Sequence, residues 1–187
     1  MLLLTLDPGG DGPGIPAQKV ILAAKSKVFS YMFDSDECKI STEKSITLPD
    51  LSYEELKALI DFFYTGKLSP QNKHFRALYI AADKYDIPYL QDFCRDHFIS
   101  RLSLSNVLDI LELSTIPSDN ILKDNAVCFV VAHMEQIVDS DRYKSFVQQY
   151  PDLNLVITKA LMTVLKYFCG HGLLTVERVR TVLLPKP

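Results

Sequence analysis

The first fifty residues alternate between apolar and turn-forming stretches, a pattern that predicts a small β-sheet with two short helices. Residues 1–6 are apolar and β-prone, and residues 8–14 hold the glycines and prolines of a turn. From Ala17 the apolar positions recur at helical spacing, and Ser26 stands where the N-cap of a second short helix is expected. Residues 45–48 then alternate as a strand. We therefore expect a hairpin, two helices and a third strand, in this order.

The clearest local signal in the chain marks a helix that begins after Ser52. Ser52 and Glu55 fit a capping box, in which the serine hydroxyl accepts from the amide three residues on and the glutamate reaches back. Apolar residues follow at helical spacing as far as Gly66, a residue type that ends helices. Similar patterns predict further helices over residues 75–82, from Pro88 to 98, from 103 to 111 with Ser103 as cap, from 118 to 130 with Ser118 as cap, from Asp141 to 146, and over 153–168.

These patterns define the expected fold class. No strand pattern appears after Leu48, so the sheet is small and N-terminal and the remainder is helical, which makes the chain α+β and mostly helical. A last amphipathic helix over 173–183 either packs on the body of the protein or binds a partner. The helix over 153–168 has its apolar stripe at positions 153, 156, 157, 160, 161, 164, 165 and 168.

Composition narrows the classes of partner. The 187 residues are 48% hydrophobic and 23% charged, which is a globular composition. A net charge of -3 offers no basic field for nucleic acid. No apolar run approaches the roughly 20 residues that cross a bilayer, and Asp7 and Pro8 end the apolar start, so we expect neither a membrane partner nor a targeting segment. The scattered cysteines, at positions 38, 94, 128 and 169, are typical of reduced thiols in a cytosolic or nuclear protein.

Candidate chemistry is sparse. The glycine-rich residues 8–14 lack the Lys and Ser or Thr of a phosphate loop. Cys94 and His97 stand three apart on a helix, but a structural zinc needs four ligands, so a metal-assisted enzyme that uses this pair is only the catalytic alternative. The carboxylates at 34, 36 and 37 are typical of a solvated loop rather than an acid and base pair. We predict no catalytic residue, no cofactor and no metal.

Three ordered motifs resemble one family. Residues 15–33, IPAQKVILAAKSKVFSYMF, resemble the opening of the BTB/POZ domain, F-x-A-H-K-x-x-L-A-A-R-S-x-V-F-x-x-M-F. Residues 46–50 (ITLPD), 62–66 (FFYTG) and 78–90 (LYIAADKYDIPYL) are similar to its strand, its capped helix and its A-A-D-K-Y helix pair. The resemblance implies a BTB/POZ fold over residues 1–100. It continues more weakly over 101–157, which looks like the three-box or BACK-like helices of plant BTB and speckle-type MATH-BTB proteins, and residues 158–187 are expected to form a helical tail of unknown role.

The resemblance implies a non-catalytic adaptor. Such a protein homodimerises, or pairs with another BTB domain, and docks on a cullin of a RING ubiquitin ligase so that an unidentified protein substrate is ubiquitinated. The alternative is a BTB scaffold or transcriptional-regulation module that does not bind cullin. The dimer face implied by the resemblance is weakened because Gln18 replaces the usual His and Lys25 the usual Arg, and its residues alternatively fill the monomer core. It comprises Ala17, Val20, Ile21, Ala24 and Lys25.

The cullin-facing residues implied by the resemblance include a loop that departs from the family. Cullin-binding members carry a hydrophobic residue, any residue and Glu, where this chain has Glu37, Cys38 and Lys39. Loss of one buried apolar anchor is worth on the order of 2 kcal/mol, or tenfold or more in affinity. The other implied contacts, which alternatively are ordinary surface and core residues, are Phe33, Asp83, Lys84, Tyr85 and Leu108.

Overall fold

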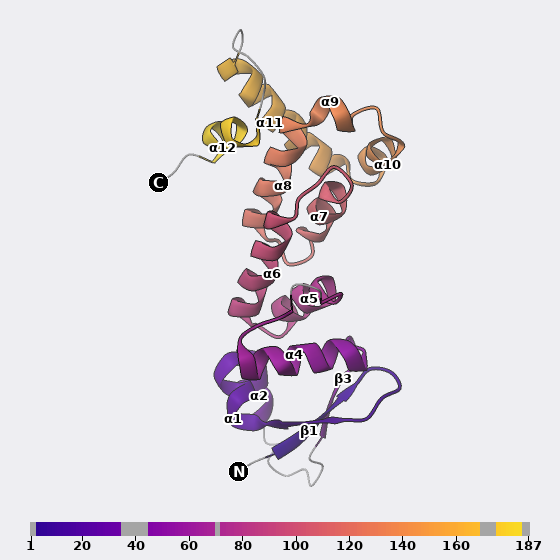
Figure 1. Cartoon of the computed structure of the whole chain (residues 1–187), viewed down its shortest axis with the longest axis vertical. Helices are drawn as coiled ribbons and strands as arrows, with labels where there is room; N and C mark the ends of the chain where they lie inside the picture. The colour runs from indigo at the N-terminus through magenta and orange to yellow at the C-terminus, as the bar shows by residue number, and fades with distance from the viewer. Residues whose placement is uncertain (1–2, 35–44, 70–71, 169–174, 185–187) are drawn as a thin grey trace. The chain divides into compact units, whose positions relative to one another are not determined.

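The computed structural model describes residues 3–34, 45–69, 72–168 and 175–184 (Figure 1). The chain forms two compact units, residues 1–95 and residues 96–187. The predicted α+β class, mostly helical with a small N-terminal sheet, is confirmed. No helix within the described residues is long and apolar enough to cross a membrane.

The first unit contains a three-stranded sheet in the order β2-β1-β3. The central strand β1 (Leu3–Pro8) pairs antiparallel with β2 (Ile15–Gln18) and parallel with β3 (Ser45–Leu48), so the predicted hairpin and third strand are confirmed. Along β1, Leu4 and Leu6 are buried on one face while Leu3 lies exposed, the alternation expected of a half-buried strand.

Two short helices follow the hairpin, as predicted. They are α1 (Lys19–Lys25) and α2 (Lys27–Asp34), and the buried Ser26 lies between them. The Ser26 hydroxyl accepts from the backbone N–H of Phe29 at 3.0 Å, which confirms its role as the N-cap of α2. The same hydroxyl donates to the carbonyl of Tyr85, so it also joins α2 to a loop far along the chain.

The helix α4 (Tyr53–Thr65) packs on β1, β2 and α1 and has the predicted ends. Ser52 and Glu55 form both hydrogen bonds of the capping box, and Gly66 closes the helix in the left-handed conformation with φ 68°. The helix α5 (Phe75–Lys84) packs against α4, and α6 (Pro88–Ser100) follows it.

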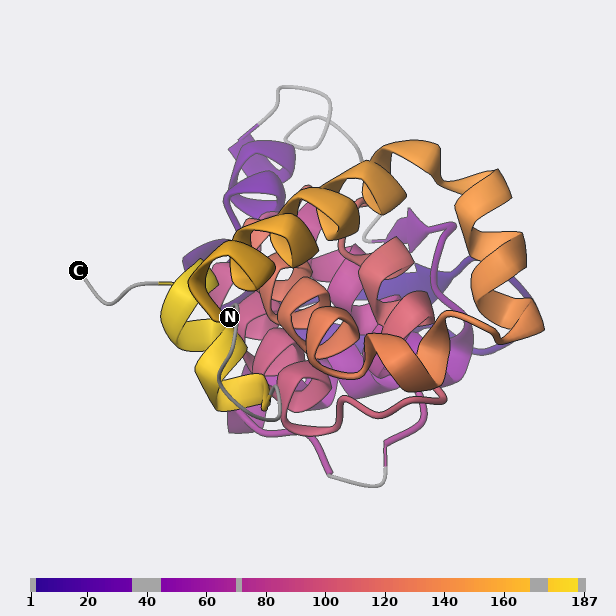
Figure 2. The same ribbon diagram turned by 90° about the horizontal axis from the view of Figure 1, so that it is seen from above.

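The second unit is a helical cluster centred on α8 (Asn120–Ala132), which contacts α7 (Val107–Leu113), α9 (Met134–Ile137), α11 (Pro151–Phe168) and α12 (Val176–Leu183). The helix α10 (Asp141–Gln149) packs on α11. In Figure 2, α11 is the long orange-to-gold helix that crosses over α8. The predicted division at residue 157 falls inside α11, so residues 158–168 continue the helix that begins at Pro151.

Two predicted helix caps are wrong. The helix α7 begins after Asn106, whose side chain accepts from the backbone N–H of Ser103 and thereby closes a turn ahead of the helix. Ser118 adopts a left-handed backbone with φ 52°, and the next residue, Asp119, caps α8 by accepting from Leu122 N–H at 3.1 Å. Adjacent polar residues satisfy the same sequence rule, so the rule alone does not select between them. The short helix α9 was not predicted.

Replacing Arg180 by methionine should stabilise the second unit. Arg180 lies on α12, which packs on α8 and α11, and its Nε is buried without a hydrogen-bond partner. An unpaired buried N–H costs about 1–3 kcal/mol, and methionine keeps an apolar stem of similar length without the polar atom. We therefore expect Arg180→Met to raise the free energy of unfolding by about 1 kcal/mol, measured by urea denaturation.

The matched variant Arg142→Met should lose stability, because Arg142 on α10 forms ion pairs with Asp109 and Glu112. If Arg180→Met lowers the free energy of unfolding, the other interactions of this guanidinium stabilise the fold by more than the unpaired Nε destabilises it.

Candidate functional site

The predicted dimer residues divide into buried and exposed groups. Ala17 in β2 lies opposite Leu4 of β1 and is fully buried, so it offers no surface to a second copy. Ile21 is half-buried. Val20, Ala24 and Lys25 on α1 are exposed, and Val20 is 72% exposed. The surface part of this prediction therefore reduces to the outward face of α1.

One further exposed apolar residue lies on the strand that pairs with β2 and was not among the predicted dimer residues. Leu3, at the start of β1, is 49% exposed and pairs in register with Gln18, two residues before Val20. The strand alternation that buries Leu4 and Leu6 places Leu3 on the opposite face of the sheet. This alternation in the sequence could have predicted that Leu3 is exposed. Neighbouring exposed apolar side chains favour a protein-binding surface. We call Leu3, Val20 and Ala24 the α1 face.

The junction between β2 and α1 is held by a tyrosine rather than by a cap. Gln18 precedes α1, but its side chain makes no capping hydrogen bond. Its backbone N–H instead donates to the Tyr64 hydroxyl of α4 at 3.1 Å. The tyrosine of the FFYTG motif thus anchors the start of the α1 face.

An aromatic column brings together two groups of predicted cullin-facing residues. The Phe29 ring stacks on Phe33 with centroids 6.1 Å apart and on Tyr85 with centroids 5.4 Å apart. Phe33 at the end of α2 is half-buried, and Tyr85 after α5 is buried. Although they are far apart in the sequence, Phe33 and Tyr85 are therefore connected through the Phe29 ring.

Charged groups fix the segment Asp83–Tyr85. Lys84 forms an ion pair with Asp50, and the Tyr85 hydroxyl donates to Asp50 Oδ2 at 3.4 Å. The hydrogen bond from Lys84 holds the pKa of Asp50 below its ordinary value. Burial, followed by the Asp50 charge, raises the pKa of Tyr85 to about 12, so the phenol stays a neutral donor. Asp83 and Lys84 remain exposed, whereas Tyr85 serves to position them.

The remaining predicted cullin-facing residues do not add described surface. Leu108 on α7 is buried among the core residues of the second unit. Glu37, Cys38 and Lys39 lie outside the described residues.

The candidate metal pair has unsuitable chemistry. Cys94 is fully buried, and burial raises the pKa of its thiol to about 12, which disfavours the thiolate that ligates metals. Burial, and then the charge of Arg101, lowers the pKa of His97. Among the described residues, no group of three or more His, Cys, Asp or Glu side chains is placed to hold a metal ion.

Comparison with known proteins identifies the family. Residues 8–102 match the family model of the BTB/POZ domain. The chain belongs to the BTB/POZ family. BTB domains typically dimerise, and proteins that contain them are generally non-catalytic interaction modules.

The similarity to plant BTB/POZ proteins covers more of the chain than the family model does. The chain is 58% identical over 155 residues to BTB/POZ domain-containing protein At1g01640 of Arabidopsis thaliana, a match that covers 83% of this chain and 75% of that protein. It is 45% identical over 161 residues to At3g56230 of the same plant, covering 85% and 57% of the two chains. Among solved structures, the BTB domain of zebrafish PATZ1 matches with 26% identity and a TM-score of 0.41, covering 50% of this chain and 71% of that one.

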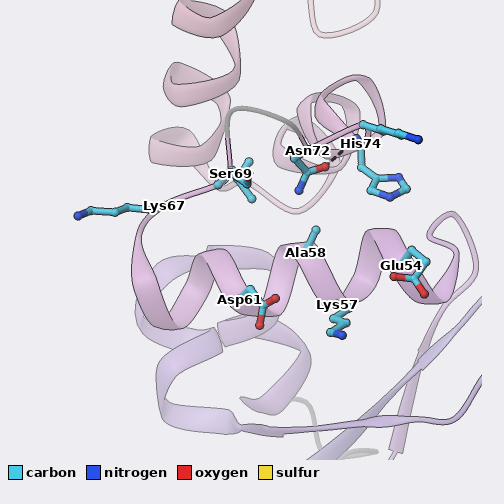
Figure 3. A pocket seen from close by; sticks show the side chains of 10 residues that line it. Glu54, Lys57, Ala58, Asp61, Lys67, Ser69, Asn72 and His74 are labelled. Carbon is cyan, nitrogen blue, oxygen red and sulfur yellow. Dashed lines mark hydrogen bonds between the residues drawn. The ribbon is translucent and has the colours of Figure 1, made fainter.

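The BTB/POZ domain also contains a hollow of about 430 Å³ between α4 and the segment before α5. Figure 3 shows Lys57 and Asp61 on the α4 side and Asn72 and His74 on the other. The His74 ring lies 3.8 Å from the Glu55 carboxylate, and its backbone N–H donates to Asn72 at 2.7 Å. These contacts hold the imidazole in place beside the first turn of α4.

The pKa of the Glu55 carboxyl reflects two opposing effects. Burial alone raises the pKa of the Glu55 carboxyl, but hydrogen bonds from Ser52 and the nearby His74 outweigh it and hold that pKa below its ordinary value. The carboxylate therefore stays ionised as the acceptor of the capping box, and its pairing with His74 links the starts of α4 and α5.

Proposed function

We propose that the protein is a non-catalytic adaptor that dimerises through the α1 face and presents a protein substrate to a cullin-RING ubiquitin ligase. The observation that supports it most is the aromatic column, because the buried Phe29 ring contacts both Phe33, which is half-buried, and Tyr85, which follows the exposed Asp83 and Lys84. A partner that contacts both Phe33 and the Asp83–Tyr85 segment would bind residues from two of the motifs that resemble the family. The α1 face lies on β1 and α1, whereas Phe33 lies on α2 and Asp83 and Lys84 lie on α5, so a dimer partner and a cullin need not compete for the same residues.

The helices after the BTB/POZ domain have a supporting role in this proposal. We assign α7 to α10 to a three-box or BACK-like extension, in which Leu108 acts by shaping α7 from within and not by contact. The substrate is unidentified, and the second BTB domain is either a copy of this chain or a related one. We place this activity in the cytosol or nucleus, in agreement with the free and buried thiols of Cys94 and Cys128.

A second candidate function is a BTB scaffold that does not bind cullin. The observation in its favour is the sequence at positions 37 to 39, where Glu37 and Lys39 replace the hydrophobic anchor and the acidic residue of cullin-binding members. Loss of one such anchor weakens binding by about tenfold or more. The two candidates therefore differ in one measurable affinity.

The dimer is tested by sedimentation of a Val20→Asp variant. Val20 is 72% exposed, so the monomer should keep its stability, while an unpaired carboxylate at the centre of the α1 face should weaken dimerisation at least tenfold. Ile121→Asp on α8, also at an exposed apolar position, is the control that should leave the dimer intact. A wild-type chain that sediments as a monomer would contradict the dimer.

Cullin binding is tested with the purified cullin and the same dimer. The adaptor proposal predicts measurable binding by the native chain and about tenfold tighter binding by Glu37→Leu with Lys39→Glu. The scaffold candidate predicts binding only by the double variant. If neither protein binds, the cullin proposal is wrong in both forms.

A further inference from the structure

The helix α11 is apolar on two faces, of which only one is covered. Leu153, Ile157 and Val164 are buried within the second unit, where α11 packs on α8, α10 and α12. Leu155 and Met162 on the other side are 51% and 53% exposed, although the residues are as hydrophobic as those inside. A helix that is hydrophobic all round is normally buried all round, but no element within the described residues covers this outer face.

The outer face has the spacing of a helix-packing seam. Leu155, Thr158, Met162 and Leu165 follow one another at steps of three and four residues, and all four are exposed. We call these four residues the α11 seam. Steps of three and four are the a and d positions of a heptad, which meet a second helix by knobs-into-holes packing. A strand or loop would not match this repeat, whereas a helix matches it along its length.

Charges beside the seam specify the chemistry of that helix. Lys159 and Lys166 each lie four residues after an apolar residue of the seam, on the same flank and one heptad apart. Both are exposed, and none of the ion pairs among the described residues includes either lysine. Asp152 in the first turn is the only acidic residue in α11. The flank is therefore basic over its central and C-terminal parts.

We propose that the α11 seam binds an amphipathic helix of a partner protein, with acidic side chains one heptad apart that pair with Lys159 and Lys166. A second copy of the chain fits the charges less well. A symmetric antiparallel pair matches Asp152 with Lys166 but sets Lys159 against itself. A parallel pair places Asn154 and Leu161 opposite the lysines, and neither carries a charge.

The α11 seam shares no residue with the set proposed to bind cullin, and its test does not involve cullin. An adaptor needs a place to hold its client, and a helix-binding seam outside the BTB/POZ domain supplies one.

Two labelled synthetic peptides test the proposal against the full chain by fluorescence anisotropy. Both have three heptads with Leu at a and d, and one carries Glu at e and g while the other carries Lys. We expect the Glu peptide to bind at least tenfold more tightly than the Lys peptide. Lys159→Glu with Lys166→Glu should reverse this preference, because the double variant converts the basic flank into an acidic one.

Variants on the two sides of α11 locate the bound peptide. Met162→Glu introduces a charge into the seam and should weaken binding of the Glu peptide at least tenfold. Tyr167→Glu, on the same helix at a position that is 73% exposed but outside the seam, should leave it unchanged. The proposal is overturned if both peptides bind equally tightly or if neither binds. It is also overturned if the chain binds no peptide but self-associates, and Met162→Glu abolishes that self-association. Circular dichroism of every variant establishes that α11 has remained folded.

Discussion

Phe29→Ala should lower the free energy of unfolding by about 3–5 kcal/mol, the range for removing a buried phenylalanine ring. Phe29 is fully buried in α2, where its ring meets Phe33, Phe63 and Tyr85. Truncation leaves a cavity bounded by three aromatic rings that belong to separate elements. Because packed rings relax only partly around a cavity, most of the lost contact energy is not recovered.

Urea denaturation followed by circular dichroism measures this loss, and Phe33→Ala is the matched control. Phe33 lies one helical turn further along α2 and is half-buried, so its truncation should cost clearly less. Equal losses for the two variants would show that the column is not centred on Phe29. At a temperature where Phe29→Ala is still folded, weakened cullin binding by this variant would indicate that the column positions the proposed surface.

The elements of the fold could be predicted where a local rule acts on neighbouring residues. Ser52, Glu55 and Gly66 specify both ends of α4 through hydrogen bonds and a backbone conformation that involve only the helix and its caps. The caps of α7 and α8 were misplaced because several polar residues precede each helix. At Ser118 the left-handed backbone moves the cap to Asp119, a feature that spacing does not reveal.

The candidate surfaces depended on tertiary contacts that spacing does not specify. Motif similarity identified Phe33 and Tyr85 separately, but it did not identify Phe29 as the ring between them or Asp50 as the partner of Lys84. Ala17 shows the complementary problem, because an apolar residue within a motif is equally compatible with a core and with an interface.

The helix α11 shows why periodicity did not predict which face is buried. Its predicted apolar stripe includes 153, 157 and 164, which are buried, but also 156 and 165, which are exposed. Where apolar residues occupy most of a helix, the hydrophobic pattern no longer selects one face, and packing against the neighbours decides. The exposed Leu155 and Met162 were outside that stripe and became visible only in the structure.

Gly9→Ala should destabilise the BTB/POZ domain by about 1–3 kcal/mol, the typical cost of overpacking. Gly9 follows β1, and its backbone N–H donates to the Leu51 carbonyl at 2.9 Å. A Cβ at this position would lie 1.9 Å from the Pro49 carbonyl oxygen and 2.4 Å from its carbon. These are backbone atoms, so no rotamer change relieves the clash, and the hairpin must move away from the segment that leads into α4.

Gly10→Ala is the matched control, because a Cβ there meets nothing within 4 Å. It should leave stability unchanged or raise it by about 0.4–1 kcal/mol through the lower entropy of the unfolded chain. Both variants remove one glycine from the same turn. A difference in stability between them, measured by thermal or urea unfolding, therefore reports the clash with Pro49 and not the loss of a glycine. The hairpin carries Leu3 and leads into Val20, so Gly9→Ala should also weaken the dimer, whereas Gly10→Ala should not. If the two variants were equally stable, the contact between the turn and Pro49 would not constrain the hairpin, and the α1 face would have to be held chiefly by Tyr64.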